Sequence, residues 1–255
     1  MSAVLEVQGL SKSFGGIHAV KNVSLSIEPG ELLALIGPNG AGKSTCFNLI
    51  AGQLKPDSGT VRLAETNIEG KAPREIWRLG VGRTFQIAST FGSMTVCENV
   101  QMAFLSLYRQ TWTTAKLVGD CYRAESMALL DRLGVADQAD RTCALLAYGD
   151  VKRVELAIAL VNEPRLLLMD EPTAGMAPAE REDLMRLTSE LVAERQMGVL
   201  FTEHDMDAVF GHSHRIMVLD RGQIISQGRP DEVRADPEVR RIYLGDEMPV
   251  ELVTP

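Results

Sequence analysis

The chain has 255 residues, 45% of them hydrophobic and 24% charged, and its 26 Lys and Arg against 34 Asp and Glu give a formal net charge of −8. This is the composition of an ordinary globular protein, which excludes the disordered, collagen-like and low-complexity classes. The acidic balance disfavours a nucleic-acid binder, because contacts to a phosphate backbone require a basic surface, and we expect no nucleic-acid partner.

Up to residue 86, short strand patterns alternate with turns. The run 31–37 is apolar at successive positions, which is typical of a strand buried on both faces of a sheet. A Gly-rich loop follows at 37–45, and a helix is predicted over 43–52. The strands predicted for this part are 4–10, 23–27, 31–37, 60–63 and 82–85.

Between about residues 87 and 161 the strand patterns disappear, and the apolar residues take helical spacing over 98–107 and 121–133. Strand and helix patterns then alternate again, which predicts an α/β domain with a helical insertion. The elements predicted after the insertion are strands at 166–170 and 199–202, a helix at 178–196, a hairpin of 216–219 with 223–226, and short helices at 230–235 and 237–244.

The apolar runs are too short to cross a membrane. A spanning helix needs about 20 consecutive apolar residues, whereas 32–36 and 166–169 are of strand length. Residues 1–9 lack the basic and apolar segments of a secretory signal. The 4 cysteines form no CxxC pair, and we expect reduced thiols in a cytoplasmic protein.

Residues 37–44 fit the phosphate-binding P-loop pattern G-x-x-x-x-G-K-[ST]. Glycines let backbone N–H groups surround a phosphate without Cβ clashes, and the helix that follows presents its positive end to the same anion. Lys43 is expected to contact the β- and γ-phosphates, and the Ser44 hydroxyl to hold Mg²⁺. The nucleotide-binding residues predicted here are Gly37, Pro38, Asn39, Gly40, Ala41, Gly42, Lys43, Ser44 and Thr45.

A second candidate site follows the apolar run 166–169. A buried strand there would deliver Asp170 to the carboxyl edge of a parallel sheet, where ligands bind in such folds. We expect Asp170 to hold Mg²⁺ through water and Glu171 to polarise the attacking water.

Further motifs occur in the order found in ATP-binding cassette (ABC) proteins, which this chain resembles over nearly its whole length. Residues 146–150, Leu-Ala-Tyr-Gly-Asp, resemble the family's signature motif. The matches elsewhere are Phe85-Gln86 for the Q-loop, Glu203-His204-Asp205 for the switch histidine, Ala174 to Pro178 for the D-loop, and Phe14 for the aromatic that stacks on adenine.

The resemblance implies an α/β P-loop NTPase fold, with a RecA-like core, an antiparallel β subdomain and a helical subdomain. It predicts one ABC ATPase domain over 1–255, with core and β subdomain at about 1–86 and 162–228, helical subdomain at about 87–161, and a helical tail at about 229–255.

The resemblance also implies an ATPase that uses ATP and Mg²⁺. Gln86 would sense Mg²⁺ and water, and His204 would contact the γ-phosphate. The signature residues Ala147, Tyr148 and Gly149 would cap the γ-phosphate held by the opposite subunit of a dimer. The implied catalytic residues are Lys43, Gln86, Glu171 and His204, and the implied metal-binding residues are Ser44, Gln86 and Asp170.

Several segments resemble the ATPases of branched-chain amino acid importers. They are the Leu-Ala-Tyr-Gly signature, Ile36 to Ser44 combined with Gly82 to Gln86, Glu203 to Met206, and the tail 236–245. This implies a peripheral protein on the cytoplasmic face of the inner membrane, with permease subunits, a second ATPase in a homo- or heterodimer, and indirectly an extracytoplasmic solute-binding protein. A lipopolysaccharide or lipid exporter ATPase, an ABC protein outside transport and a nucleotide kinase remain the alternatives.

The chain departs from the family's usual motifs at the proposed dimer contact. Ala147 replaces the usual Ser, Asp150 and Val151 stand where Gln-Gln is common, and Ala177 replaces Asp or Asn in the D-loop. Loss of one charge-assisted contact costs about 1.5–3 kcal/mol if nothing substitutes for it. We therefore expect one hydrolytic site per chain, with slower turnover than in a standard homodimer.

Overall fold

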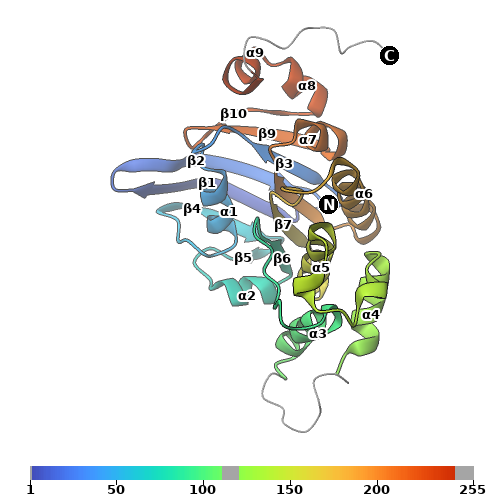
Figure 1. Ribbon diagram of the computed structural model, residues 1–255. Helices are drawn as coiled ribbons and strands as arrows, with labels where there is room; N and C mark the ends of the chain where they lie inside the picture. Colours follow the sequence, from blue (N-terminus) through green and yellow to red (C-terminus); the bar gives the residue numbers. More distant parts are fainter. Residues whose placement is uncertain (1, 111–120, 245–255) are drawn as a thin grey trace.

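The structure is a computed structural model that describes residues 2–110 and 121–244. Within these residues the strands form two sheets (Figure 1). The smaller is antiparallel, in the order β2-β1-β4-β5. Its strands are β1 (Leu5–Phe14), β2 (Ile17–Ile27), β4 (Ser58–Leu63) and β5 (Thr66–Asn67).

The larger sheet has the order β10-β9-β3-β8-β7-β6, and its pairs are parallel except for the edge hairpin β9–β10. Because β6, β7, β8 and β3 are parallel neighbours, their carboxyl ends meet at one edge of the sheet. Its strands are β3 (Leu32–Ile36), β6 (Val81–Thr84), β7 (Leu166–Asp170), β8 (Gly198–Thr202), β9 (Arg215–Asp220) and β10 (Gln223–Gly228).

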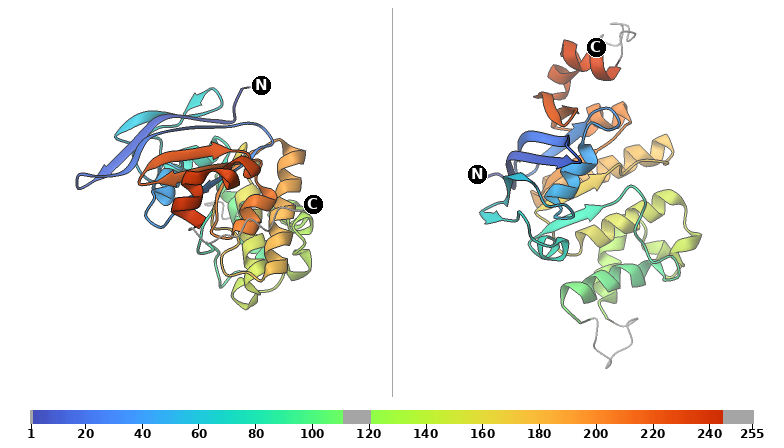
Figure 2. Two further views of the ribbon diagram at one scale, coloured as in Figure 1. Left: turned by 90° about the horizontal axis from the view of Figure 1, so that it is seen from above. Right: turned by 90° about the vertical axis from the view of Figure 1, so that its left-hand side faces the viewer.

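All the helices except α2, which lies beside β6, form three groups in space (Figure 1). Helices α3, α4 and α5 lie together at one end of the molecule, α8 and α9 lie at the other, and α1, α6 and α7 lie around the larger sheet (Figures 1 and 2). Their bounds are α1 (Lys43–Ile50), α2 (Pro73–Arg78), α3 (Val96–Leu107), α4 (Arg123–Arg132), α5 (Tyr148–Leu160), α6 (Pro178–Arg195), α7 (Met206–His212), α8 (Pro230–Ala235) and α9 (Pro237–Val239). Short helical turns cover Ala136–Gln138, Cys143–Leu145 and Arg240–Leu244.

Strand β3 separates two hydrophobic clusters, as the prediction of a strand buried on both faces requires. Leu33 and Leu35 pack in the cluster that holds the small sheet and Phe47 of α1. The alternate residues of β3 pack in the cluster that holds α5 and α6. Side chains of successive strand residues point to opposite faces, so β3 lies between two layers and carries the P-loop at its carboxyl end.

Most predicted elements are present, with shifted ends. The first strand continues to Phe14, the insertion helices are α3 and α4, and the predicted helix 237–244 is α9 followed by a π-helical turn. Helices α2 and α7 were not predicted. Only Ile76 of α2 is buried, so the segment has too little apolar periodicity to indicate a helix.

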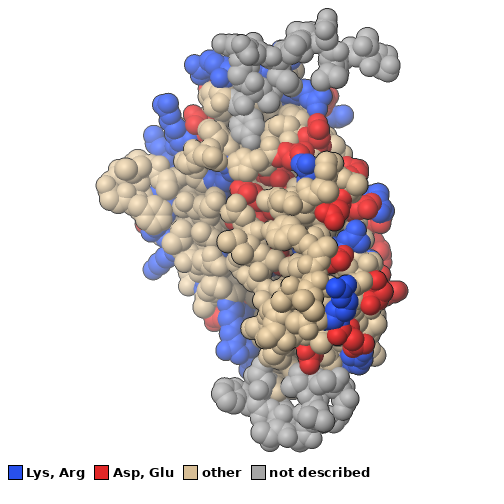
Figure 3. Space-filling model, viewed as in Figure 1, with Lys and Arg blue, Asp and Glu red and all other residues tan. Residues whose placement is uncertain are grey.

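Charged side chains are mixed on the face seen in Figure 3. Acidic side chains gather along its right-hand edge, over α4 and α6, with Lys and Arg between them. Several are paired, as in Arg186 with Glu190 at 2.7 Å within α6, and Arg132 of α4 with Glu194 of α6. Exposed pairs of this kind contribute at most about 1 kcal/mol each.

The start of α3 offers a test of local stability. Thr95 Oγ1 accepts from Glu98 N at 3.2 Å, and Glu98 Oε2 accepts from Thr95 N at 2.8 Å, which is a capping box. Thr95→Ala should lower the free energy of unfolding by about 1 kcal/mol in urea denaturation. Glu98→Gln, which retains an acceptor oxygen, should cost only a few tenths; equal losses in the two variants would contradict this role of Thr95.

Candidate active site

The P-loop, residues 37–45, joins β3 to α1. Two of its glycines pack closely against the backbone of β2 and β9. A Cβ on Gly37 would lie 2.1 Å from the Leu219 carbonyl oxygen, and one on Gly42 would lie 2.2 Å from that of Ala19. Gly42 also has a φ of 108°, a left-handed conformation that glycine adopts without strain. Both positions therefore require glycine, and the spacing of the sequence pattern has a steric cause.

Lys43, the first residue of α1, is buried with its side chain turned back over the loop. Its Nζ donates to the carbonyl oxygens of Gly37 at 2.6 Å and Pro38 at 3.3 Å. Burial lowers the pKa of Lys43, and the nearby Glu171 and Asp170 carboxylates oppose that shift. The Lys43 ammonium is thus close enough to the two carboxylates at the end of β7 to interact with them electrostatically.

Asp170 is the last residue of β7 and is oriented by its neighbours in the sheet. Its Oδ1 accepts from Thr202 Oγ1 of β8 at 2.8 Å, and its Oδ2 lies 3.9 Å from Arg83 Nη2 of β6. Sequence reasoning missed both supporting residues. Thr202 pairs directly with Asp170 across two parallel strands, a register that a single sequence does not contain.

Glu171 follows in the left-handed region, with a φ of 47°, and its N–H donates to the Thr202 carbonyl oxygen at 3.1 Å. A non-glycine residue in this conformation costs about 1–3 kcal/mol, and such residues concentrate at functional sites. Asp170 contacts Thr202 and Arg83, whereas the Glu171 carboxylate contacts Gln86 and His204. The two carboxylates consequently have different partners.

The Glu171 carboxylate lies between two of the predicted catalytic residues. Gln86 Nε2 donates to Oε2 at 2.8 Å, and His204 Nε2 lies 3.0 Å from Oε1. These three residues follow the carboxyl ends of β6, β7 and β8, which are adjacent in the sheet. The structure therefore brings Gln86, Glu171 and His204 into one hydrogen-bonded group.

The residues on either side of His204 fix its backbone. Buried Glu203 accepts from the N–H and the hydroxyl of Thr173, each at 2.7 Å. Asp205 caps α7 by accepting from Ala208 N at 3.0 Å, and it also pairs with Arg181. The acidic residues beside the histidine therefore have structural partners, of which only the Asp205 cap has a local sequence signal.

A hollow of about 350 Å³ opens beside this group. Its wall includes Glu171, His204 and Gly175 of the segment predicted as the D-loop. Tyr148 approaches the same segment, since a Cβ on Gly175 would lie 3.4 Å from its ring. The predicted D-loop and signature segments therefore lie close to each other and to Glu171.

The signature segment forms the start of α5. Ala147 is the N-cap without a side-chain hydrogen bond, Tyr148 is exposed, and Gly149 is buried against Glu180. The Tyr148 hydroxyl donates to the Gln86 carbonyl oxygen at 3.3 Å. Through this contact the segment joins the group around Glu171.

The other predicted nucleotide-binding residues lie apart from that group. Phe14 is 47% exposed at the end of β1, where the β1–β2 hairpin projects from the molecule, and its ring centroid is 5.7 Å from Lys12 Nζ (Figure 1). Ser44 is exposed on the first turn of α1, and Thr45 is half-buried. The contacts of the described chain join neither Phe14 nor Ser44 to the carboxylates.

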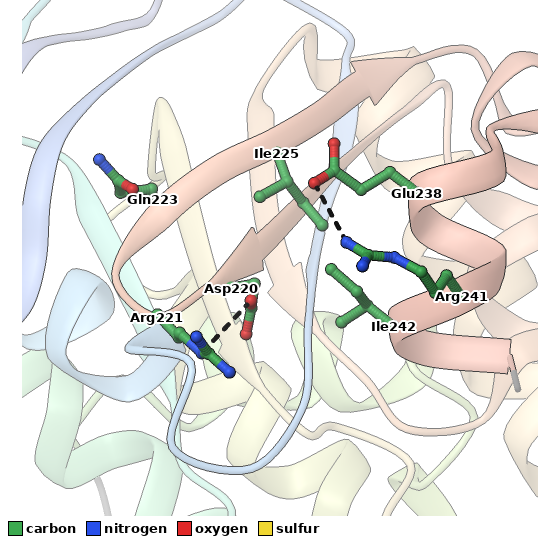
Figure 4. A pocket seen from close by; sticks show the side chains of 7 residues that line it. All are labelled: Asp220, Arg221, Gln223, Ile225, Glu238, Arg241 and Ile242. Atoms are coloured by element: carbon green, nitrogen blue, oxygen red, sulfur yellow. Dashed lines mark ion pairs between the residues drawn. The ribbon is translucent and has the colours of Figure 1, made fainter.

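A different hollow, of about 560 Å³, lies between the β9–β10 hairpin and α9 (Figure 4). Arg221 lies 3.9 Å from Asp220, and Arg241 lies 3.9 Å from Glu238. The hairpin turn also supports the P-loop, because Gly222 N donates to the Ala41 carbonyl oxygen at 2.8 Å. The four charged residues that line this hollow are thus two ion pairs, Arg221 with Asp220 and Arg241 with Glu238.

Residues 20–174 match the family described as ABC transporter. The chain belongs to the ABC transporter ATP-binding family. It is therefore an ABC ATPase that binds nucleotide, and the predicted fold class and enzyme class are confirmed. Residues 223–248 also match the family described as branched-chain amino acid ATP-binding cassette transporter.

Relatives of the whole chain agree with this assignment. The chain is 42% identical to the high-affinity branched-chain amino acid transport ATP-binding protein LivG of Salmonella typhimurium, over 95% of this chain and 98% of LivG. It is 35% identical to the lipopolysaccharide export system ATP-binding protein LptB of Acidithiobacillus ferridurans, over 98% and 100%. The resemblance to branched-chain amino acid importer ATPases is therefore confirmed.

Solved ABC structures share the fold. The ADP conformation of MJ1267, an ATP-binding cassette of an ABC transporter, is 33% identical, with a TM-score of 0.86 over 96% of this chain and all of that one. The dimeric structure of MJ0796, a bacterial ABC transporter cassette, is 27% identical, with a TM-score of 0.77 over 89% and 98%. Across the described residues, this ABC ATPase has no helix with the length and apolar character needed to cross a bilayer.

Proposed function

We propose that this ABC ATPase powers an importer of branched-chain amino acids or a related small polar solute. The observation that carries the proposal is the 42% identity to LivG over nearly both whole chains, together with the branched-chain amino acid family match at residues 223–248. The partners would be integral permease subunits, and the ATPase would lie on the cytoplasmic face of the inner membrane. A solute-binding protein on the other side would select the solute.

The P-loop would hold the phosphates of ATP, with Lys43 beside the β- and γ-phosphates and Phe14 against adenine. Mg²⁺ suits the predicted ligands, because a hydroxyl at Ser44, a carboxylate at Asp170 and an amide oxygen at Gln86 are the oxygen ligands it prefers. Asp170 is already oriented by Thr202. Bound Mg²⁺ would offset the negative charge on the phosphates.

Glu171 would orient the attacking water and accept its proton at the carboxylate. The Glu171 carboxylate accepts hydrogen bonds from Gln86 and His204, which hold it in place before ATP arrives. Attack on the γ-phosphorus forms one P–O bond and breaks the bond to the β–γ bridging oxygen, which leaves with ADP. His204 would stabilise the charge that develops on the γ-phosphoryl oxygens.

The signature segment would close the site from a second subunit. The free N–H groups at the start of α5 suit an anion, and the dimeric structure of MJ0796 belongs to a 27% identical cassette. Ala147 offers no hydroxyl to the γ-phosphate, so we expect weaker closure than with Ser. A heterodimer with a second ATPase would supply a complete signature segment.

We propose that the chain is divided into subdomains as in other ABC ATPases. The core and β subdomain would comprise about 1–86 and 162–228, and the tail about 229–255, of which 245–255 lie outside the described residues. The helical subdomain of about 87–161, part of which also lies outside them, would carry the signature segment. Its movement on closure would act on the permease.

Affinity purification of tagged Glu171→Gln protein from detergent-solubilised native membranes, with Mg-ATP and mass spectrometry, tests the function. Two permease subunits and a second ATPase of importer type are expected. The P-loop variant Lys43→Ala serves as the control for recovery that does not depend on ATP. Lipopolysaccharide-export components would move the assignment to the LptB relatives, and ribosomal or DNA-repair partners alone would contradict a role in transport.

A further inference from the structure

Helix α5 carries two buried charged side chains that the proposed mechanism does not use. Lys152 and Glu155 are only 2% and 3% exposed, and Lys152 Nζ lies 3.4 Å from Glu155 Oε2. Residues three apart share one face of a helix. Buried charges are costly unless they are paired and hydrogen-bonded, so the other contacts of this pair are informative.

Both side chains bind the backbone that follows β6. Lys152 Nζ donates to the carbonyl oxygens of Phe85 at 2.7 Å and Gln86 at 2.9 Å. Glu155 Oε1 accepts from the N–H groups of Phe85 at 2.9 Å and Ser89 at 3.3 Å. The ion pair therefore fixes peptide groups on both sides of the Gln86 side chain to α5.

The position of Gln86 matters because its side chain is exposed and has little packing to hold it. Its amide reaches Glu171 only if its backbone stays in place. The same carbonyl that Lys152 binds also accepts from Tyr148 at the start of α5. A continuous set of contacts thus runs from the signature segment through the Gln86 backbone to the Glu171 carboxylate.

We infer that Lys152 and Glu155 are a positioning pair that makes Gln86 follow α5, and so links the signature segment to the carboxylate of Glu171. The inference rests on the proposed function, because it assigns Gln86 and Glu171 to ATP hydrolysis. Lys152 and Glu155 touch neither ATP nor water in this scheme and act only through Gln86. When a second subunit engages the start of α5, Gln86 moves with that helix.

A double-mutant cycle tests the inference. Lys152→Met removes the ammonium and keeps the aliphatic stem, and it should lower kcat for ATP by about tenfold or more while KM stays within about threefold. In a Gln86→Ala background the same substitution should change kcat by less than about twofold, because the Gln86 side chain through which Lys152 acts is absent. Equal losses in both backgrounds would indicate a general structural role and overturn the inference.

Matched variants separate positioning from folding. Lys152→Met leaves a buried carboxylate without its cation, so Lys152→Met/Glu155→Leu, which removes both charges, is measured beside it. Hydrogen exchange at the amides of Phe85 and Ser89 should be about tenfold faster in this double variant. Lys152→Arg, which retains donors, should recover most of kcat, and Arg186→Met on exposed α6 should leave it unchanged.

The outcomes separate the inference from the function. If the native protein does not hydrolyse ATP, the proposed function and the inference both fail. If the native protein is active and Gln86→Ala is slow, but a folded Lys152→Met/Glu155→Leu keeps native kcat and native exchange, only the inference fails.

Discussion

Glu171→Gln should lower the rate of ATP hydrolysis by about 100- to 10,000-fold, the usual contribution of a positioned general base. The amide keeps the shape of the side chain and an oxygen for the Gln86 donor, but it cannot take the proton of water. ATP binding should persist, because Lys43 and the P-loop are unchanged. Phosphate release and retained radiolabelled ATP are the measurements.

The chain contains a matched control for this substitution. Glu182 on α6 lies 3.0 Å from His212 Nε2, the same separation that joins Glu171 to His204. Glu182→Gln removes a carboxylate from a Glu–His pair outside the proposed catalytic group, and turnover should be unchanged. Rapid steady turnover by Glu171→Gln would contradict its assignment as the base.

The Glu171→Gln variant also tests whether two subunits assemble around ATP. When hydrolysis is blocked, ATP should hold two subunits together, and light scattering should give twice the monomer mass in Mg-ATP. A strict monomer at saturating ATP would show that the signature segment of this chain, with Ala147 in place of Ser, does not close on a second copy. The partner subunit would then be a different ATPase.

Lys43→Ala should weaken ATP binding by about 100-fold or more. The ammonium is placed for charge-assisted contacts to two phosphates, each worth about 1.5–3 kcal/mol, and about 1.4 kcal/mol corresponds to a factor of ten in affinity. Lys43 currently donates to the Gly37 and Pro38 carbonyl oxygens. Isothermal titration of ATP measures the loss.

Lys55→Ala provides the comparison, because Lys55 is exposed beyond the end of α1 and carries the same charge. Its affinity for ATP should match that of the native protein. Unchanged ATP affinity in a folded Lys43→Ala protein would contradict the assignment of the P-loop lysine. Melting curves without nucleotide establish that the variant is folded.

Local patterns identified most of the elements because they depend on neighbouring residues. The run 31–37 predicted a doubly buried strand, and residues 37–44 predicted the loop after it, since both signals are contiguous. The ends shifted where tertiary contacts extended an element, as in β1, which continues to Phe14 by pairing with β2. Helix α2 has one buried residue and gave no periodic signal.

The sequence by itself determined the P-loop, the two carboxylates at the end of β7 and the family, because each depends on residue types at fixed spacing. Only the tertiary structure decided that Gln86, 85 positions from Glu171, donates to it, and that Lys152 and Glu155 hold the backbone of Gln86. The physical reason is the sheet order β3-β8-β7-β6. Strands far apart in the sequence become neighbours in that sheet, with one face packed on the small sheet and α1 and the other on α5 and α6, and no single segment encodes that arrangement.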